Sequence, residues 1–145
     1  MRIVSESPEQ TQKIAAEMAA KIRQKILAGD HAAVIAMEGE LGAGKTTFIQ
    51  GFANALGIKE KVKSPTFLLM KEFLFDEGRL YHLDCYRING PKELEILGFG
   101  KILSDPSNIV INEWAERIAQ LLPKEHIIVH IDHIDELRRQ ITITP

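Results

Sequence analysis

Eight consecutive residues at positions 39–46, Gly-Glu-Leu-Gly-Ala-Gly-Lys-Thr, have the types and spacing needed to hold a phosphate group. Three of them are glycines without a Cβ, so the loop can turn several backbone N–H groups toward one anion. Lys45 adds a positive charge that reaches the outer phosphates, and the hydroxyl of Thr46 is placed to bind Mg²⁺. The stretch matches the phosphate-binding P-loop pattern, so we expect this chain to bind a nucleotide.

The residues around this loop predict the elements that the pattern requires. Residues 32–37 form a short apolar run typical of a buried strand. Residues 45–56 place apolar side chains on one helical face, and Gly57 ends the helix. The alternative is a glycine-rich turn with an exposed lysine. A chance match would occur in on the order of one in a few hundred chains of this length, so strand, loop and helix together favour the phosphate site.

Two further apolar stretches predict strands that carry a carboxylate near their end. Residues 109–114, Ile-Val-Ile-Asn-Glu-Trp, favour a buried parallel strand that brings Glu113 to the phosphate end of the sheet, where Mg²⁺ or an attacking water would lie. Residues 80–86 bring Asp84 to the end of another strand. Glu113 could instead be an ordinary exposed strand-end residue, and Trp114 could either fill the core or form a wall of the site.

Turn and capping residues predict the remaining elements. A capping box at residues 7–10 starts a helix whose apolar positions recur every four residues until Gly29. An Asp-Glu-Gly-Arg turn at positions 76–79 joins two strand-like stretches into an antiparallel hairpin. The hairpin strands are residues 67–75 and 80–86, later helices cover residues 91–97 and 115–122, and late strands cover residues 127–131 and 140–143.

Some polar residues have both a plain and a functional interpretation. Thr11, in the first turn of the first helix, is either a surface residue or a neighbour of the nucleotide. The proline-punctuated loop at residues 62–67 contains Thr66, and it is either a connector or a switch-like loop over the γ-phosphate. The histidines lack metal-ligand spacing, so we interpret all of them as non-ligands. They are His31, His82, His126, His130 and His133.

The composition excludes several classes of protein. At 145 residues the chain has the length of one domain, and a hydrophobic content of 45% is ordinary for a soluble globule. The net charge of −2, with scattered Lys and Arg, disfavours tight binding to RNA or DNA by this chain alone. Cys85 is the only cysteine, so no internal disulfide can form and a reducing compartment is expected. Without a signal-peptide pattern or a long apolar run, we expect a cytoplasmic protein that does not span a membrane.

Together these motifs resemble the bacterial TsaE family, formerly called YjeE. The P-loop alone is common to thousands of proteins, whereas its combination with the later blocks is specific. The blocks occur in the family's order and cover most of residues 39–114, although Cys85 and Asn112 stand where apolar residues are usual. The shared blocks are Gly-Glu-Leu-Gly-Ala-Gly-Lys-Thr-Thr at 39–47, Ser-Pro-Thr-Phe at 64–67, His-Leu-Asp-Cys-Tyr-Arg at 82–87, Glu-Leu at 93–94 with Gly98, and Glu-Trp at 113–114.

The resemblance implies a small ATPase that uses ATP and Mg²⁺ and helps to make threonylcarbamoyladenosine beside the anticodon of certain tRNAs. It implies the TsaB–TsaD complex as the protein partner, with tRNA met only indirectly through that complex, and ATP hydrolysis that resets the complex between turnovers. The implied fold is an α/β domain over residues 1–145, a P-loop NTPase-like mixed sheet with helices on both faces and an inserted β-hairpin.

The resemblance also implies a role for each site residue. Mg²⁺ is held by Thr46 and Glu113, while Asp84 assists hydrolysis near the metal together with Glu113 and Lys45. Thr66 belongs to the switch-like loop. The phosphates are held by Gly42, Ala43, Gly44, Lys45, Thr46 and Thr47. The residues assigned to the surroundings of the nucleotide are Thr11, Trp114 and Arg138.

Three other classes of P-loop protein remain as alternatives. A small GTPase would carry an Asn/Thr-Lys-x-Asp motif for guanine, which this sequence does not contain. A small-molecule kinase would need an acceptor pocket and an arginine-rich lid, for which only Arg138 and Arg139 are candidates. A regulatory module that binds ATP without hydrolysing it would keep Lys45 but would not need Asp84 and Glu113.

Overall fold

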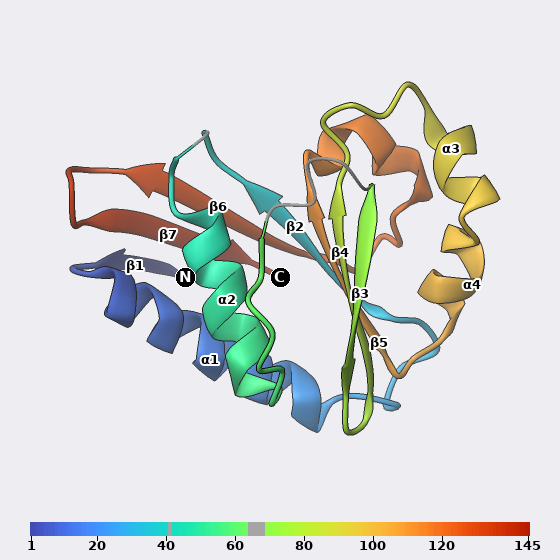
Figure 1. Cartoon of the computed structure of the whole chain (residues 1–145), viewed down its shortest axis with the longest axis horizontal. Coiled ribbons are helices and arrows are strands. Elements are labelled where there is room, and N and C mark those ends of the chain that lie inside the picture. Colours follow the sequence, from blue (N-terminus) through green and yellow to red (C-terminus); the bar gives the residue numbers. More distant parts are fainter. Residues whose placement is uncertain (41, 64–68) are drawn as a thin grey trace.

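A seven-stranded mixed sheet forms the centre of the molecule, with strand order β1-β7-β6-β2-β5-β4-β3 (Figure 1). The computed structural model describes residues 1–40, 42–63 and 69–145. In chain order the elements are β1 (Arg2–Ser5), α1 (Pro8–Gln24), β2 (Ala33–Glu38), α2 (Lys45–Ala55), β3 (Met70–Phe75), β4 (Gly78–Asp84), α3 (Pro91–Ile96), α4 (Phe99–Ser104), β5 (Asn108–Glu113), the 3₁₀ helix η1 (Ala115–Leu121), β6 (Ile127–His133) and β7 (Arg139–Thr144).

The sheet has a parallel centre and antiparallel edges. β2 lies between β5 and β6 and is parallel to both, and β4 is parallel to β5. Such central strands are covered on both faces, which explains why β5 is buried along its whole length and why β2 is an almost continuous apolar run. β3 and β4 form an antiparallel hairpin on one side, while β6, β7 and β1 pair antiparallel on the other. The predicted mixed sheet with an inserted hairpin is confirmed.

Helices pack on both faces of this sheet, as predicted, because alternate side chains of each central strand point to opposite faces. In β2, Ile35 and Met37 belong to a core formed with α1 and α2. Val34 lies in a second core, which it shares with Leu94 of α3 and Phe99 of α4. Figure 1 shows α1 and α2 lying side by side on one face. The sequence thus builds two apolar layers around one sheet.

Several element boundaries differ from those expected from the sequence. α1 ends at Gln24 rather than near Gly29, because the chain leaves the helix at Lys25 and Leu27 adopts the left-handed conformation with φ of 71°. The side chain of Gln10 accepts from the backbone N–H of Glu6 at 2.7 Å, one residue before the position that a capping box uses. Strand β1 and helix α4 were not predicted, and the helix after Trp114 is of the 3₁₀ type.

Cys85, directly after β4, is buried and is expected to be unreactive. The thiol is 1% exposed, and its pKa is raised to about 12, first by burial and then by the negative charges of Asp84, Glu116 and Glu113. A thiol with this pKa stays protonated at neutral pH and is a poor nucleophile.

A membrane-crossing helix is not found among the described residues, because no helix there combines sufficient length with an apolar composition.

The contact between α1 and α2 requires a glycine at position 51. A Cβ on Gly51 would lie 2.5 Å from the Cα and 2.7 Å from the backbone oxygen of Gln12 in α1. Backbone atoms cannot move aside as the end of a flexible side chain can. The two helices can therefore approach this closely only because Gly51 has no side chain.

We predict that Gly51→Ala lowers the free energy of unfolding by about 1–3 kcal/mol through overpacking. This loss occurs although alanine favours a helix over glycine by about 1 kcal/mol. The matched control is Gly100→Ala in α4, where a Cβ would meet no atom within 4 Å, so stability should be unchanged or slightly raised. Urea unfolding followed by circular dichroism measures both variants. Equal midpoints for the two would contradict the packing argument.

Candidate functional site

The glycine-rich loop between β2 and α2, which carries the P-loop pattern, is shaped by its glycines and by the strands beside it. Gly39, Gly42 and Gly44 have φ values of +136°, +79° and +104°, a region that favours glycine. A Cβ on Gly39 would lie 2.5 Å from the backbone oxygen of Ile131 in β6, so the first glycine of the motif is also required by packing. The loop conformation is therefore determined by both its own residues and the sheet.

Helix α2 begins directly after this loop and has an N-terminus suited to an anion. Gly44 is the N-cap residue, and no side chain caps the helix. The first turn also contains no acidic residue that would compete for its N–H groups. Backbone N–H groups and the positive end of the helix dipole therefore point toward the loop, which is the arrangement that binds phosphate.

Lys45 is held at the mouth of the loop by three contacts. Its Nζ donates to the backbone oxygen of Gly39 at 3.0 Å and lies 3.9 Å from Oε1 of Glu113. It also lies 5.2 Å from the centre of the Trp114 ring. The side chain is almost fully buried, so the charge is compensated by a carboxylate, a carbonyl and an aromatic face rather than by water.

Glu113 and Asp84 lie at the same edge of the sheet, as their strand-end positions predicted. β5 is parallel to β2 and β4, and Glu113 is in register with Met37 on one side and Asp84 on the other. Glu113 is 6% exposed, which excludes the alternative of an ordinary exposed strand-end residue. Asp84 is half-buried, and its carboxylate accepts from the backbone N–H of Tyr86 at 3.0 Å. Asp84 and Glu113 are thus neighbours at the end of adjacent strands, and Glu113 lies beside Lys45.

The sequence did not predict the residue that contacts Glu113 most closely. His82 is fully buried in β4, and its Nε2 lies 2.8 Å from Oε2 of Glu113. The available signal was its spacing: two residues before Asp84 on a strand, it must share a face with that carboxylate. Only the placement of β4 next to β5 reveals that His82 faces Glu113.

Trp114 combines the two roles considered for it. It adopts the left-handed conformation with φ of 59° at the start of η1, and its ring packs partly against the second core. Its other contacts are with the site: Lys45 lies over the ring, and the Tyr86 ring lies 5.0 Å away. Arg117 lies 5.7 Å from the centre of Tyr86. The indole therefore links the loop lysine to a surface Tyr–Arg pair.

Two cavities adjoin the loop, and each is lined by some of the residues that were predicted to bind the nucleotide. One, of about 240 Å³, is lined by Met37, Glu38, Gly39, Lys45, Trp114 and Glu116. The other, of about 40 Å³, is lined by Pro8, Thr11, Gly44, Thr47, Glu136, Leu137 and Arg139. Thr11, Gly44 and Thr47 are thus brought together in space. The interpretation of Thr11 as a surface residue is wrong, because Thr11 is 2% exposed and its hydroxyl is hydrogen-bonded to the Ser5 hydroxyl at 2.6 Å.

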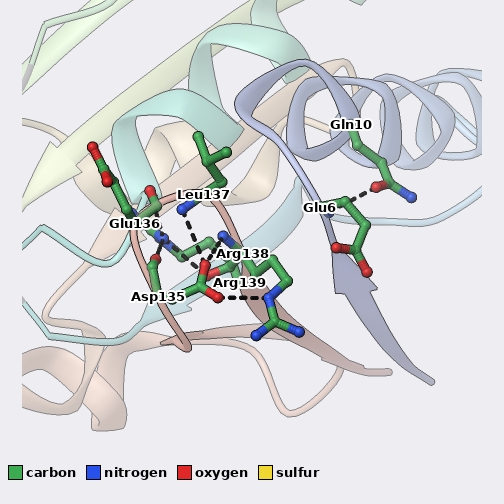
Figure 2. Close-up of polar contacts among 7 residues, drawn as sticks. All are labelled: Glu6, Gln10, Asp135, Glu136, Leu137, Arg138 and Arg139. Carbon is green, nitrogen blue, oxygen red and sulfur yellow. Dashed lines mark hydrogen bonds and ion pairs between the residues drawn. The ribbon is translucent and has the colours of Figure 1, made fainter.

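Neighbouring arginines in the turn between β6 and β7 have different positions (Figure 2). Arg138 is exposed, and its Nε donates to the carboxylate of Asp135 at 2.6 Å within the same turn. Arg138 lines neither cavity, whereas Arg139, which was not predicted, lines the smaller one. Nε of Arg139 donates to the backbone oxygen of Ala43 at 2.9 Å, and its Nη1 donates to the carbonyls of Asp135 and Arg138. Arg139 thus fastens this turn to the loop.

The residues present fit a nucleotide-bound magnesium ion better than an independent metal centre. Within the described ranges, no group of three or more His, Cys, Asp and Glu side chains could hold a metal ion. Mg²⁺ typically takes one or two protein ligands and completes its shell with phosphate oxygens and water. Thr46 is exposed at the start of α2, and Glu113 is the buried acid beside Lys45. The other predicted loop residue, Thr66, lies outside the described residues.

Comparisons with known proteins agree with the motifs. The family profile described as threonylcarbamoyl adenosine biosynthesis protein TsaE matches residues 5–141. The tRNA threonylcarbamoyladenosine biosynthesis protein TsaE of Bacillus subtilis is 40% identical over 138 residues, which are 95% of this chain and 81% of that protein. The TsaE protein of Aquifex aeolicus is 38% identical over 97% of this chain and 93% of its own length.

The fold has a counterpart among solved structures. A crystal structure of YdiB from Bacillus subtilis superposes with a TM-score of 0.72 at 32% sequence identity, over 99% of this chain and 83% of that one. The family profile covers the loop, the strand-end carboxylates and most of the C-terminal hairpin. The chain belongs to the TsaE family of tRNA threonylcarbamoyladenosine biosynthesis proteins.

Proposed function

We propose that this protein binds ATP with Mg²⁺, hydrolyses it, and thereby sustains tRNA threonylcarbamoyladenosine formation by the TsaB–TsaD complex. The observation that carries the proposal is the position of Lys45. Its ammonium lies beside an uncapped helix N-terminus and 3.9 Å from the buried carboxylate of Glu113. A cation, an anion-binding helix end and a metal-binding acid at one point are the parts that nucleoside triphosphate hydrolysis requires.

Each part of the site has a defined task in this proposal. Backbone N–H groups of residues 42–47 hold the phosphates, and Lys45 adds a charge-assisted contact. Thr46 and Glu113 hold Mg²⁺, which supplies neutralisation of the phosphate charge. Asp84, in register with Glu113, helps to orient the attacking water.

The arginines near the loop support a requirement for a partner. Arg139 uses Nε and Nη1 on backbone carbonyls, and Arg138 is paired with Asp135. These contacts hold each guanidinium group in its place, so neither group can move toward a transferring phosphoryl group without breaking them. An arginine supplied by a partner raises hydrolysis by about 10³–10⁵ in other P-loop proteins. A net charge of −2 also disfavours direct tRNA binding. We therefore propose that this chain alone hydrolyses ATP slowly and that TsaB–TsaD accelerates the hydrolysis.

We predict that Lys45→Ala folds but binds ATP more weakly, because the phosphates keep the backbone nest and lose one charged contact. Such a contact contributes about 1.5–3 kcal/mol, which corresponds to a roughly 10- to 150-fold rise in Kd. Titration with a fluorescent ATP analogue measures the change. Lys21→Ala on the exposed face of α1 is the control and should bind as wild type does. Unchanged affinity of Lys45→Ala would show that the loop does not hold phosphate.

We predict that Asp84→Ala and Glu113→Ala each reduce kcat for ATP hydrolysis at least about tenfold, equivalent to roughly 1.4 kcal/mol of barrier. The reason is that both carboxylates act on the metal and the water rather than on the phosphate nest. Phosphate release at saturating ATP is the measurement, and Glu95→Ala in α3 is an exposed acidic control. A variant with full turnover would lose its assigned role.

The proposed link to tRNA modification is tested by multiple-turnover synthesis of threonylcarbamoyladenosine. Adding TsaB–TsaD should raise ATP hydrolysis well above the sum of the separate proteins, because the complex supplies what the chain lacks. Glu113→Ala should still bind TsaB–TsaD in a pull-down but should support only a first round of modification. Sustained modification with this variant would disprove that hydrolysis resets the complex, even if binding to TsaB–TsaD were observed.

A further inference from the structure

A buried histidine contacts the proposed catalytic glutamate and has no assigned task. His82 is fully buried within β4, and its Nε2 lies 2.8 Å from Oε2 of Glu113. Its Nδ1 has no hydrogen-bond partner among the described residues. A leucine or phenylalanine would fill the same space without burying two ring nitrogens, so packing alone does not explain a histidine here.

The contact with Glu113 determines where the ring carries its hydrogen. An ionised carboxylate can only accept, so Nε2 must donate to Oε2. A hydrogen on Nδ1 would be a buried donor without an acceptor among the described residues, whereas a bare Nδ1 is only an unused acceptor. The arrangement therefore favours the form of His82 with its hydrogen on Nε2.

The two oxygens of Glu113 have different neighbours. Oε2 faces His82, and Oε1 lies 3.9 Å from Nζ of Lys45. The terminal torsion of a glutamate is broad and roughly two-fold, so a carboxylate without such contacts would rotate. One hydrogen bond and one charge, each on its own oxygen, hold the plane of this carboxylate in a single orientation.

We propose that His82 is the positioning residue of the site: it fixes the Glu113 carboxylate in the orientation that binds the metal and directs water. This inference rests on the proposed role of Glu113 in ATP hydrolysis. The strand geometry supports it, because His82 and Asp84 are two residues apart in β4 and therefore point to the same face of the sheet. The register pairs Asp84 with Glu113 and His82 with Ile111, two residues earlier on β5. One strand thus contributes both a second carboxylate and the group that orients the first.

Two substitutions of similar size separate a hydrogen bond from packing. His82→Gln can present an N–H near the position of Nε2, whereas His82→Met fills the space without a donor. Loss of a residue that hydrogen-bonds a metal ligand typically lowers activity about 10- to 100-fold. His82→Met should therefore lower kcat about 10- to 100-fold. Its affinity for ADP without Mg²⁺ should be unchanged. His82→Gln should recover most of the turnover. Equal turnover of wild type and His82→Met, or an equal loss in both variants, would overturn the proposal.

A double substitution tests whether His82 acts through Glu113. If it does, adding His82→Met to Glu113→Ala should cause no further loss of kcat, because the carboxylate to be positioned is already absent. A further loss as large as that seen in the wild-type background would overturn the assignment. Urea unfolding of each variant confirms that the compared proteins are folded.

A spectroscopic measurement keeps the inference independent of activity and of variant folding. In the ¹⁵N spectrum of the wild-type imidazoles, His82 should show a hydrogen on Nε2 that is protected from exchange, and Glu113→Ala should remove this protection. A hydrogen on Nδ1, or rapid exchange at Nε2, would overturn the inference. Wild-type protein without ATP turnover would refute the proposed function instead, and the spectrum would still decide the role of His82.

Discussion

The pairing of two buried charges, Lys45 and Glu113, is the constraint on which the site depends. Both residues are 6% exposed, and each charge offsets part of the cost of burying the other. The pair joins the start of α2 to the end of β5, and its secondary contacts add the end of β2 through Gly39 and the face of β4 through His82. Four elements that are distant in the sequence are therefore fixed relative to one another by one electrostatic requirement.

The glycine-rich loop before α2 is supported by the C-terminal hairpin as much as by its own glycines. Gly39 packs against the backbone of β6 at Ile131, and Gly44 lies under the side chain of Arg139 from β7. The Arg139 guanidinium also donates hydrogen bonds to the backbone oxygen of Ala43 and to two backbone oxygens of the turn between β6 and β7. This explains why a segment without catalytic motifs belongs to the same functional unit: it holds the loop in the shape that exposes its N–H groups.

The two apolar cores serve different parts of this arrangement. The core under α1 and α2 anchors α2, and Gly51 allows the backbone of α2 to approach that of α1 closely. The other core lies under α3, α4 and η1 and packs against the opposite face of β4 and β5. Part of Trp114 also packs against it. The strand-end residues on the α2 face thus lie on a sheet that is packed from both sides. Such packing is needed to hold a carboxylate within the narrow limits that catalysis requires.

The local sequence determined the parts of this protein whose chemistry lies within a few residues. The P-loop pattern, its flanking strand and helix, the hairpin around positions 76–79 and the apolar strand before Glu113 all follow from spacing and turn chemistry. The family resemblance also came from short blocks in a particular order. These features require no knowledge of which strands are neighbours.

The tertiary structure alone decided the relationships between distant elements. β1 is a strand because residues 2–5 pair with β7, about as far away in sequence as this chain allows. His82 became a site residue only when β4 was placed beside β5. Arg139, the first residue of β7, donates a hydrogen bond to the backbone oxygen of Ala43 in the loop, whereas Arg138 precedes the strand and pairs with Asp135 within the turn. Strand pairing and the face on which a side chain lies are non-local properties. Residue type and spacing therefore determined which chemical groups are present, and packing determined which of them lie together beside the loop.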